Sequence, residues 1–295
     1  MFSGFLNIHK PLGITSHDVV NNVRRLTIRD FQSKKVGHAG TLDPLAEGVL
    51  IVCVGDATRL SDYVMHQTKV YRAKIHLGIE TETYDAEGQI VSSVDATHVS
   101  RDAIEKALRA FVGDIQQVPP IYSAIKKDGK KLYELARAGQ EVVVELRSVH
   151  IERITLLSFE SPFVTIDIEC GAGTYIRSLA HDLGAALGVG AHLAALIRTR
   201  SGQFDVENAV MLDVMAASEQ WTNYIIAPYI ALEAYPQFIV TEEQARELSF
   251  GRAIPIQQSD IETCMVYLSD HQLIAVASIE DNLLKPQKVF AHGTH

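Results

Sequence analysis

The chain has 295 residues, 47% of them hydrophobic, and a formal net charge of −9. That length and apolar content suffice for one large domain and a small one. No apolar run approaches the roughly 20 residues that cross a bilayer, and no secretory signal pattern opens the chain. Cys53, Cys170 and Cys264 have neither disulfide nor metal-ligand spacing. We therefore expect a cytoplasmic protein with buried thiols, no membrane attachment and no metal site.

Apolar residues recur with the two periods that distinguish strands from helices. Short strands are expected at residues 5–8 and 49–54, and alternating strands at residues 70–77 and 163–170. The strand at residues 70–77 places Tyr71 on its apolar face. Helices are expected to begin at, or directly after, Ser16, Asp56, Ser100 and Thr174. The irregular order of these elements, without a βαβ repeat, predicts an α+β fold with a mixed, largely antiparallel central sheet.

Residues 117–147 read as an insertion in this pattern. Pro119 and Pro120 interrupt regular structure, residues 126–131 are strongly basic, and residues 132–137 suit a short helix. The functional interpretation is an arm that contacts a partner. The alternative is a solvated excursion, because loops of this composition are commonly exposed.

Between residues 225 and 236 the apolar residues follow no clear helix or strand period, and we place a domain boundary near residue 234. The expected domains are therefore residues 1–233 and residues 234–295. In the second, Thr241 and Gln244 form a capping box for a short helix. Two apolar runs on either side of residues 269–272 then predict a hairpin, so this small domain should be mainly β.

The net charge argues against general affinity for nucleic acids. The basic residues are nevertheless concentrated in two segments. Residues 10–40 carry six Lys or Arg against two Asp, and residues 120–139 carry five against two acidic residues. Two basic patches on an acidic body suit selective docking of one RNA, whereas two solvated faces are the alternative interpretation.

One carboxylate, Asp43, lies in a loop of defined shape. Glycines frame the segment Gly37–Gly48, and Pro44 follows Asp43 directly. Glycine allows backbone angles that other residues avoid, while proline fixes one dihedral. A carboxylate held in such a loop before a strand is a candidate nucleophile or acid–base group. The alternative is an Asp that only caps the turn.

Four segments in order resemble the family of pseudouridine synthases related to bacterial TruB, which modify the uridine at position 55 of tRNA. They are Asn7–Ser16, Gly37–Gly48, Lys69–Lys74 and Glu169–Leu179. The resemblance implies a pseudouridine synthase fold and a small C-terminal PUA-like domain. It also implies that residues 117–147 form a thumb that grips RNA. Because the reaction is an isomerisation, no cofactor is expected.

The same resemblance implies roles for three residues. Asp43 would act as the nucleophile, on C1′ or on the base, and Arg177 would pair with it. A neighbouring guanidinium normally lowers the pKa of a carboxylate, so we expect an ionised Asp43. Tyr71 would stack on the target base or take its C5 proton; an ordinary core tyrosine is the alternative.

Further residues are expected around the RNA or its flipped base. His38 would contact the RNA, or else only satisfy a backbone carbonyl. Lys10 and Pro11 would shape the site from beneath, Leu196 would close the base pocket, and Tyr175 would pack on the pocket or on the core. The expected RNA-gripping lysines of the thumb are Lys126, Lys127, Lys130 and Lys131.

The expected partner is the T stem-loop of tRNA, bound by a monomer without an obligate protein partner. Two alternatives remain open. One is a guide-RNA-dependent synthase of the dyskerin type, against which the long insertion argues. The other is a non-catalytic tRNA-folding chaperone, which has no need of Asp43, Tyr71 and Arg177 together. A retaining glycosidase is disfavoured, because that chemistry normally uses two carboxylates.

Overall fold

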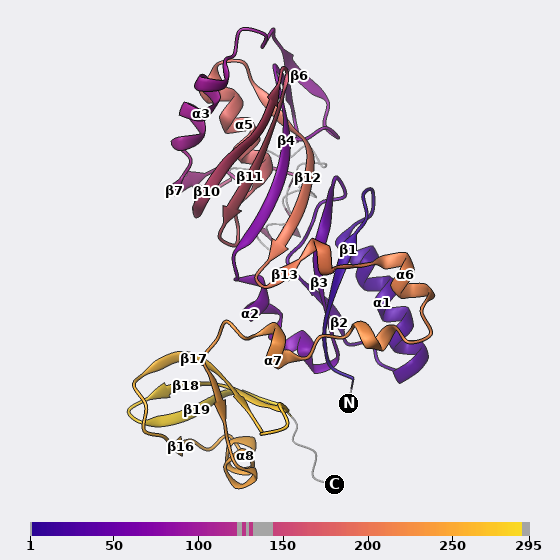
Figure 1. Ribbon diagram of the computed structural model, residues 1–295, viewed down its shortest axis with the longest axis vertical. Coiled ribbons are helices and arrows are strands. Elements are labelled where there is room, and N and C mark those ends of the chain that lie inside the picture. Colours follow the sequence, from indigo (N-terminus) through magenta and orange to yellow (C-terminus); the bar gives the residue numbers. More distant parts are fainter. Residues whose placement is uncertain (1, 123–125, 128–129, 132–143, 291–295) are drawn as a thin grey trace.

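The computed structural model describes residues 2–122, 126–127, 130–131 and 144–290. Within them, ten strands form one twisted sheet (Figure 1). Eight follow in the order β14 (Val210–Met211), β1 (Gly4–Lys10), β3 (Ala46–Val54), β12 (Ala191–Ser201), β4 (Lys69–Leu77), β11 (Phe163–Cys170), β10 (Arg147–Glu160) and β7 (Gly113–Gln117); β2 (Val36–Ala39) pairs with β3, and β13 (Phe204–Asp205) pairs with β12.

Only two described pairings in this sheet are parallel, β1 with β14 and β3 with β12. The prediction of a mixed, largely antiparallel sheet is therefore confirmed. The alternating strand at residues 163–170 has the expected register, burying Val164, Ile166, Ile168 and Cys170 completely. The strand at residues 70–77 likewise buries Ala73 and Ile75.

The sheet has two halves that meet at a short seam. Pairing of β3 with β12 covers only Ala46–Gly48 against Leu196–Arg198. Close approach requires glycine at position 48: its φ is +97°, and a Cβ there would lie 2.4 Å from the Arg198 carbonyl oxygen. The residues that line the cavity described below come from the loop before β3, from β4, from β12 and from the start of α5.

Helices cover the two halves separately (Figure 1). Helix α1 (Ser16–Phe31) packs by β2, whereas α5 (Ile176–Leu187) packs on β12 and against α3 (Arg101–Arg109). Their apolar residues at helical spacing are buried, among them Val19, Val23, Leu179 and Leu183. The shorter helical segments are η1 (Gly55–Leu60), α2 (Ser61–Met65), η2 (Val206–Asn208), α6 (Leu212–Ala217), η3 (Trp221–Tyr224) and α7 (Pro228–Ala231).

Two helix starts differ from the sequence prediction. Thr15, not Ser16, caps α1, in a reciprocal capping box with Asp18. Helix α5 begins at Ile176 after Tyr175, and the Thr174 hydroxyl instead donates to the Gly171 carbonyl at 3.0 Å. The Ser100 cap is confirmed, since its hydroxyl accepts from the Ala103 amide.

The C-terminal region is mainly β, as predicted. Its sheet has the order β15 (Gln237–Ile239), β17 (Ile261–Tyr267), β18 (Leu273–Glu280), β19 (Leu283–Val289) and β16 (Ile254–Pro255), with one helix, α8 (Glu242–Ser249). The predicted capping box and the β17–β18 hairpin are both present. Met265 and Tyr267 share a buried cluster with Phe5 and Ile51, so this sheet packs on the first one. A domain boundary near residue 234 stays a prediction.

Within the thumb-like insertion, the described backbone is a two-stranded pair of β8 (Lys126–Lys127) and β9 (Lys130–Lys131). The helix expected at residues 132–137 lies outside the described residues. A second small pair joins β5 (Ile79–Thr81) to β6 (Ile90–Ser93). No helix in the described ranges is long and apolar enough to cross a bilayer. All three cysteines are buried free thiols, as expected.

Candidate active site

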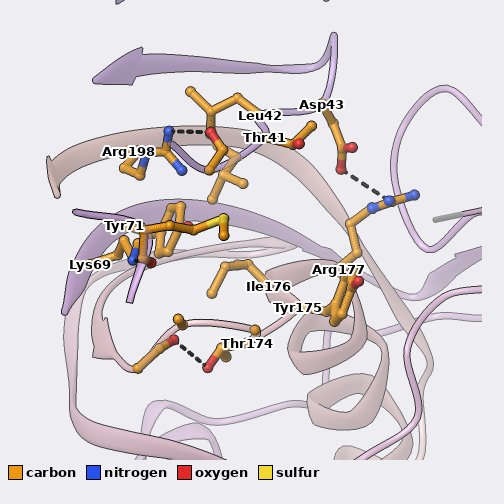
Figure 2. Close-up of a pocket in the computed structure, with 16 residues that line it drawn as sticks. Thr41, Leu42, Asp43, Lys69, Tyr71, Thr174, Tyr175, Ile176, Arg177 and Arg198 are labelled. Carbon is orange, nitrogen blue, oxygen red and sulfur yellow. Dashed lines mark hydrogen bonds and ion pairs between the residues drawn. The ribbon is translucent and has the colours of Figure 1, made fainter. Parts of the chain in front are cut away.

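A cavity of about 360 Å³ opens at the seam between the two halves of the sheet. This volume lies within the roughly 300–1,000 Å³ typical of ligand pockets. Of the residues predicted from the sequence, Asp43, Tyr71, Tyr175, Arg177 and Leu196 line it. Asp43 comes from the β2–β3 loop, Tyr71 from β4, and Tyr175 and Arg177 from the start of α5 (Figure 2), whereas Leu196 belongs to β12.

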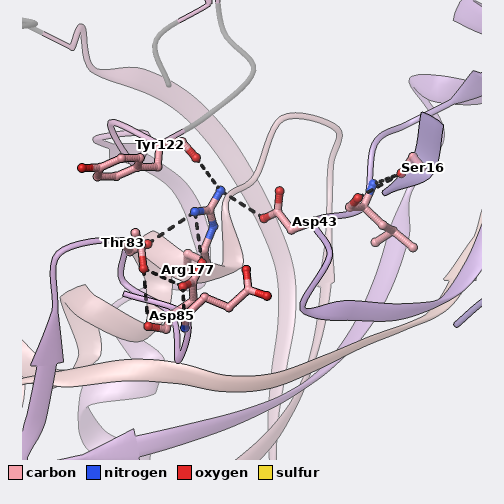
Figure 3. A network of polar contacts seen from close by, with 8 residues as sticks. Ser16, Asp43, Thr83, Asp85, Tyr122 and Arg177 are labelled. Carbon is pink, nitrogen blue, oxygen red and sulfur yellow. Dashed lines mark hydrogen bonds and ion pairs between the residues drawn. The ribbon is translucent and has the colours of Figure 1, made fainter. Parts of the chain in front are cut away.

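Asp43 and Arg177 form the expected ion pair, with 3.0 Å between Asp43 Oδ2 and Arg177 Nη2 (Figures 2 and 3). The guanidinium is nearly buried, whereas the Asp43 side chain keeps 43% of its surface exposed. No described group bonds Asp43 Oδ1. The pair therefore holds one carboxylate oxygen and leaves the other available to react.

A second carboxylate anchors the other side of the guanidinium. Arg177 Nη1 donates to Asp85 Oδ2 at 3.2 Å, and the Asp85 side chain is only 5% exposed. Arg177 also donates to the Thr83 and Tyr122 carbonyls, at 3.4 and 3.0 Å (Figure 3). Because the arginine fork is rigid, these contacts fix its direction toward Asp43.

The prediction that Asp43 has a lowered pKa is wrong, because in this structure the pKa is raised above its usual value. Withdrawal from bulk water raises the pKa of Asp43 most strongly. Arg177 opposes that shift, but Asp85 shares Arg177 and its negative charge raises the pKa of Asp43 further. The sequence predicted the neighbouring Arg177 guanidinium. It did not predict the burial of Asp43 or the nearby charge of Asp85, which are the two causes that raise the pKa.

Tyr71 lies across the cavity beside a buried arginine. Arg198 is its cross-strand neighbour in the β4–β12 pairing, and the guanidinium charge acts on the Tyr71 phenol. Burial raises the pKa of Tyr71, with Arg198 opposing, so the hydroxyl is protonated at neutral pH. Tyr71 thus presents both an aromatic face and a neutral hydroxyl to the cavity.

Arg198 also shapes the Asp43 loop. Its guanidinium is 1% exposed, and Nε and Nη2 donate to the Val49 and Gly40 carbonyls at 2.7 and 3.1 Å. Pairing of β2 with β3 ends at Ala39 and Ile51, and Gly40 and Val49 lie just beyond that end. The Arg198 guanidinium therefore bonds carbonyls that the β2–β3 ladder leaves without a partner. The hairpin opens there and presents Asp43.

Lys10, Pro11 and His38 are not among the residues that line the cavity. Lys10 is buried and donates to the Pro11 and Ile14 carbonyls at 2.9 and 2.6 Å; burial lowers its pKa to about 8. The turn it organises reaches the Asp43 loop, because the Gly13 amide donates to the Pro44 carbonyl at 2.9 Å. A role for Lys10 and Pro11 in shaping the site from beneath stays a prediction.

His38 lies in β2, behind the Asp43 loop. Its Nδ1 is buried and has no hydrogen-bond partner within the described chain. Burial, and then the charge of Arg198, lowers the pKa of His38, so the ring is neutral at pH 7. Direct contact of His38 with RNA stays a prediction, as does the grip of Lys126, Lys127, Lys130 and Lys131.

Sequence reasoning missed three residues of this site. Asp85 and Arg198 are described above, and Lys69 lines the cavity while donating to the Met65 and Gln67 carbonyls. Burial lowers the pKa of Lys69 to about 8. Lys69 and Arg198 stand out in the sequence only as charges within apolar strands, which is a weak signal for function. Asp85 carried no signal, since it precedes a polar turn.

The described residues contain no group of three or more His, Cys, Asp or Glu placed to hold a metal ion.

Comparison with known proteins gives consistent relatives. A model described as TruB family pseudouridylate synthase (N terminal domain) matches residues 28–176, and one described as tRNA pseudouridylate synthase B C-terminal domain matches residues 177–233. A protein named tRNA pseudouridine synthase B from Symbiobacterium thermophilum is 48% identical over 253 residues, covering 85% of this chain and 82% of the relative. Its namesake from Dehalococcoides mccartyi strain ATCC BAA-2100 is 42% identical over 292 residues, covering 97% and 96%.

Solved structures agree with this fold. A chain in the crystal structure of a Cbf5–Nop10–Gar1 complex is 28% identical, with a TM-score of 0.75 over 98% of this chain and 85% of that chain. A chain in an H/ACA RNP bound to a substrate RNA containing 2′-deoxyuridine is 25% identical, with a TM-score of 0.74 over 98% and 85%. With family models that together match residues 28–233, and with relatives 42% and 48% identical over most of its length, this chain belongs to the TruB family of pseudouridylate synthases.

Proposed function

We propose that this protein converts uridine to pseudouridine in tRNA, and that its target is uridine 55 in the T loop. The observation that carries the chemistry is the Asp43–Arg177 ion pair in a cavity walled by Tyr71. The relatives named tRNA pseudouridine synthase B support the substrate class. Position 55 rests on the family resemblance of the four sequence segments.

In the proposed reaction the N1–C1′ bond of uridine breaks, the uracil turns, and C5 joins C1′. The proton leaves C5 and N1 takes up a proton, so product and substrate have the same atoms. Asp43 Oδ1, which Arg177 leaves unengaged, attacks C1′ or the base. The bond that it forms breaks again when C5 joins C1′ or afterwards, which regenerates the free carboxylate. Arg177 stabilises the carboxylate, with a hydrogen bond to a charged group contributing about 1.5–3 kcal/mol.

Tyr71 supports the detached base in this scheme. Its ring stacks on the uracil, which contributes roughly 1–3 kcal/mol in sites that bind single-stranded bases. Its hydroxyl lies beside Arg198 and is the candidate acceptor for the C5 proton. Since burial raises the pKa of Tyr71, that transfer requires the hydroxyl to lose its own proton first.

The target nucleotide must leave the folded T loop before it reaches Asp43. Extrusion costs a few kcal/mol of unstacking, which contacts to phosphates and to the flipped base offset. We assign the base contacts to Tyr175 and Leu196 in the cavity wall, and the phosphate contacts to the lysines of β8 and β9.

A guide-RNA-dependent activity is less well supported. The chains from the Cbf5–Nop10–Gar1 complex and from the H/ACA RNP share the fold at 28% and 25% identity, whereas the relatives named tRNA pseudouridine synthase B are 42% and 48% identical. A purely structural role in tRNA folding does not account for a carboxylate and a guanidinium paired inside a cavity. Action as a cytoplasmic monomer remains a prediction.

The direct test incubates the purified chain with unmodified tRNA transcript and maps pseudouridine by position. We expect modification at uridine 55 without added RNA or protein. Modification that appears only with a guide RNA would support the dyskerin-type alternative. Refolding of tRNA without any pseudouridine would support the chaperone, and modification at another uridine would refute the assignment of position 55.

A further inference from the structure

Ser16 makes an unusual pair of contacts with the loop that carries Asp43. Its hydroxyl accepts a hydrogen bond from the Leu42 amide at 2.8 Å and donates one to the Leu42 carbonyl at 2.9 Å (Figure 3). Ser16 is 2% exposed, and 26 residues separate the two partners along the chain. Because Thr15 performs the capping of α1, the Ser16 hydroxyl is left entirely to Leu42.

These two bonds replace a missing strand partner. In an antiparallel ladder, every second pair of opposite residues exchanges both of its backbone hydrogen bonds. Leu42 lies beyond the last β2–β3 pair, Ala39 with Ile51, so no strand supplies that exchange. Leu42 is itself buried, and an unsatisfied buried amide or carbonyl is costly. One side-chain hydroxyl satisfies both groups.

Asp43 is the next residue after Leu42. The backbone–backbone bonds of its loop lie on the far side of Asp43: the Ala46 amide donates to the Asp43 carbonyl at 3.0 Å, and the Gly13 amide donates to the Pro44 carbonyl at 2.9 Å. On the near side, Arg198 holds the Gly40 carbonyl, two residues before Leu42. Ser16 is therefore the described contact that fixes the peptide entering Asp43. Figure 3 shows Asp43 between this anchor and Arg177.

We propose that Ser16 is a positioning residue that sets the direction of the Asp43 carboxylate toward the reacting nucleotide. This inference rests on the proposed function and goes one step beyond it, because Ser16 touches neither substrate nor Arg177. Misplacing a reactive group by 1 Å can cost about 100-fold in rate. Loss of the Ser16 hydroxyl should therefore slow chemistry more than it weakens RNA binding.

The variant is Ser16→Ala, and Thr27→Val on the same helix is its matched control. Thr27 is fully buried, and its hydroxyl contacts the Arg24 and Ser33 carbonyls at 3.1 and 2.8 Å, away from the Asp43 loop. Both variants should lower the melting temperature. Only Ser16→Ala should slow single turnover at saturating tRNA, by about 30-fold or more, with the tRNA Kd unchanged within about threefold.

A second measurement is independent of activity. Amide hydrogen exchange at Leu42 should rise in Ser16→Ala and stay at the wild-type level in Thr27→Val, because only the first loses the anchor. Ser16→Cys, which keeps the bulk and offers a weak thiol donor, should give an intermediate rate. It also serves if Ser16→Ala does not fold.

Two results in the Ser16 variants would overturn the inference. One is a Ser16 variant that binds tRNA and turns over at the wild-type rate. The other is unchanged exchange at Leu42. An equal rate loss in Thr27→Val would also overturn it, by showing a general effect of helix α1. If the wild-type chain forms no pseudouridine, the proposed function fails, and the exchange measurement still decides whether Ser16 holds the loop.

Discussion

Asp85→Asn tests whether the buried carboxylate directs Arg177. Asp85 Oδ1 already accepts from the Thr83 hydroxyl at 2.5 Å and from the Glu87 amide at 3.1 Å. In the variant the new side-chain oxygen should keep those two donors. Its amide nitrogen then takes the place of Oδ2 and faces Arg177 Nη1. Because both nitrogens are hydrogen-bond donors, no bond forms between them.

The size of the effect follows from burial. Asp85 and Arg177 are 5% and 8% exposed, and breaking a buried charge pair costs about 3–5 kcal/mol. In the variant Arg177 keeps its contacts with Asp43 and with two backbone carbonyls, so we expect a cost at the lower end of this range. A cost of about 3 kcal/mol placed wholly on the barrier corresponds to a rate loss of about 150-fold. Any part of this cost that instead lowers the free energy of unfolding makes the expected rate loss smaller by the corresponding factor.

The pH profile should change in a defined direction. The negative charge of Asp85 raises the pKa of Asp43, and Asp85 also shares the guanidinium that lowers it. Removing that charge therefore lowers the pKa of Asp43. Since Asp43 is proposed to react in its ionised form, the acid limb of the single-turnover rate should move to lower pH even as the maximal rate falls.

Release of tritium from tRNA carrying [5-³H]uridine measures both quantities, because C5 loses its hydrogen in the reaction. Asp167→Asn is the matched control: Asp167 pairs with Arg72 through two 2.9 Å bonds on the surface of the sheet, where such pairs contribute about 0–1 kcal/mol. A rate within about threefold of wild type in Asp85→Asn, or an acid limb that moves to higher pH, would refute the reasoning.

Three further outcomes are expected. Asp43→Asn should abolish pseudouridine formation while tRNA binding persists. Turnover retained at more than about one hundredth of the wild-type rate, which corresponds to a barrier increase below roughly 3 kcal/mol, would contradict a nucleophilic role. Tyr71→Phe should lose nearly all single-turnover activity, because it keeps the stacking ring but not the hydroxyl; a near-wild-type rate would leave stacking as its role. Replacing Lys126 and Lys130 should weaken tRNA binding and flatten its salt dependence by about one to two units. An unchanged slope would mean that these lysines form only a solvated face, and the chemical step at saturating tRNA should be unaffected.

Local patterns in the sequence predicted most of the elements. Alternation of apolar residues located β11 and most of β4, and the Thr241–Gln244 capping box located α8. These features depend on neighbours two to four residues apart, so they are legible without a fold. Ser16 illustrates the limit: the sequence predicted it as the cap of α1, whereas in the structure Thr15 is the cap and the Ser16 hydroxyl bonds Leu42, which is distant in sequence.

By itself, the sequence determined the family, the α+β class and the identity of Asp43, Tyr71 and Arg177 as candidates, because those residues stand in motifs that are continuous in the chain. Only the tertiary structure brought Asp85 to Arg177, Arg198 to Gly40 and Val49, and Ser16 to Leu42. It also reversed the expected direction of the Asp43 pKa. The physical reason is the same in each case: burial and charge act through space, between segments that the order of residues leaves far apart.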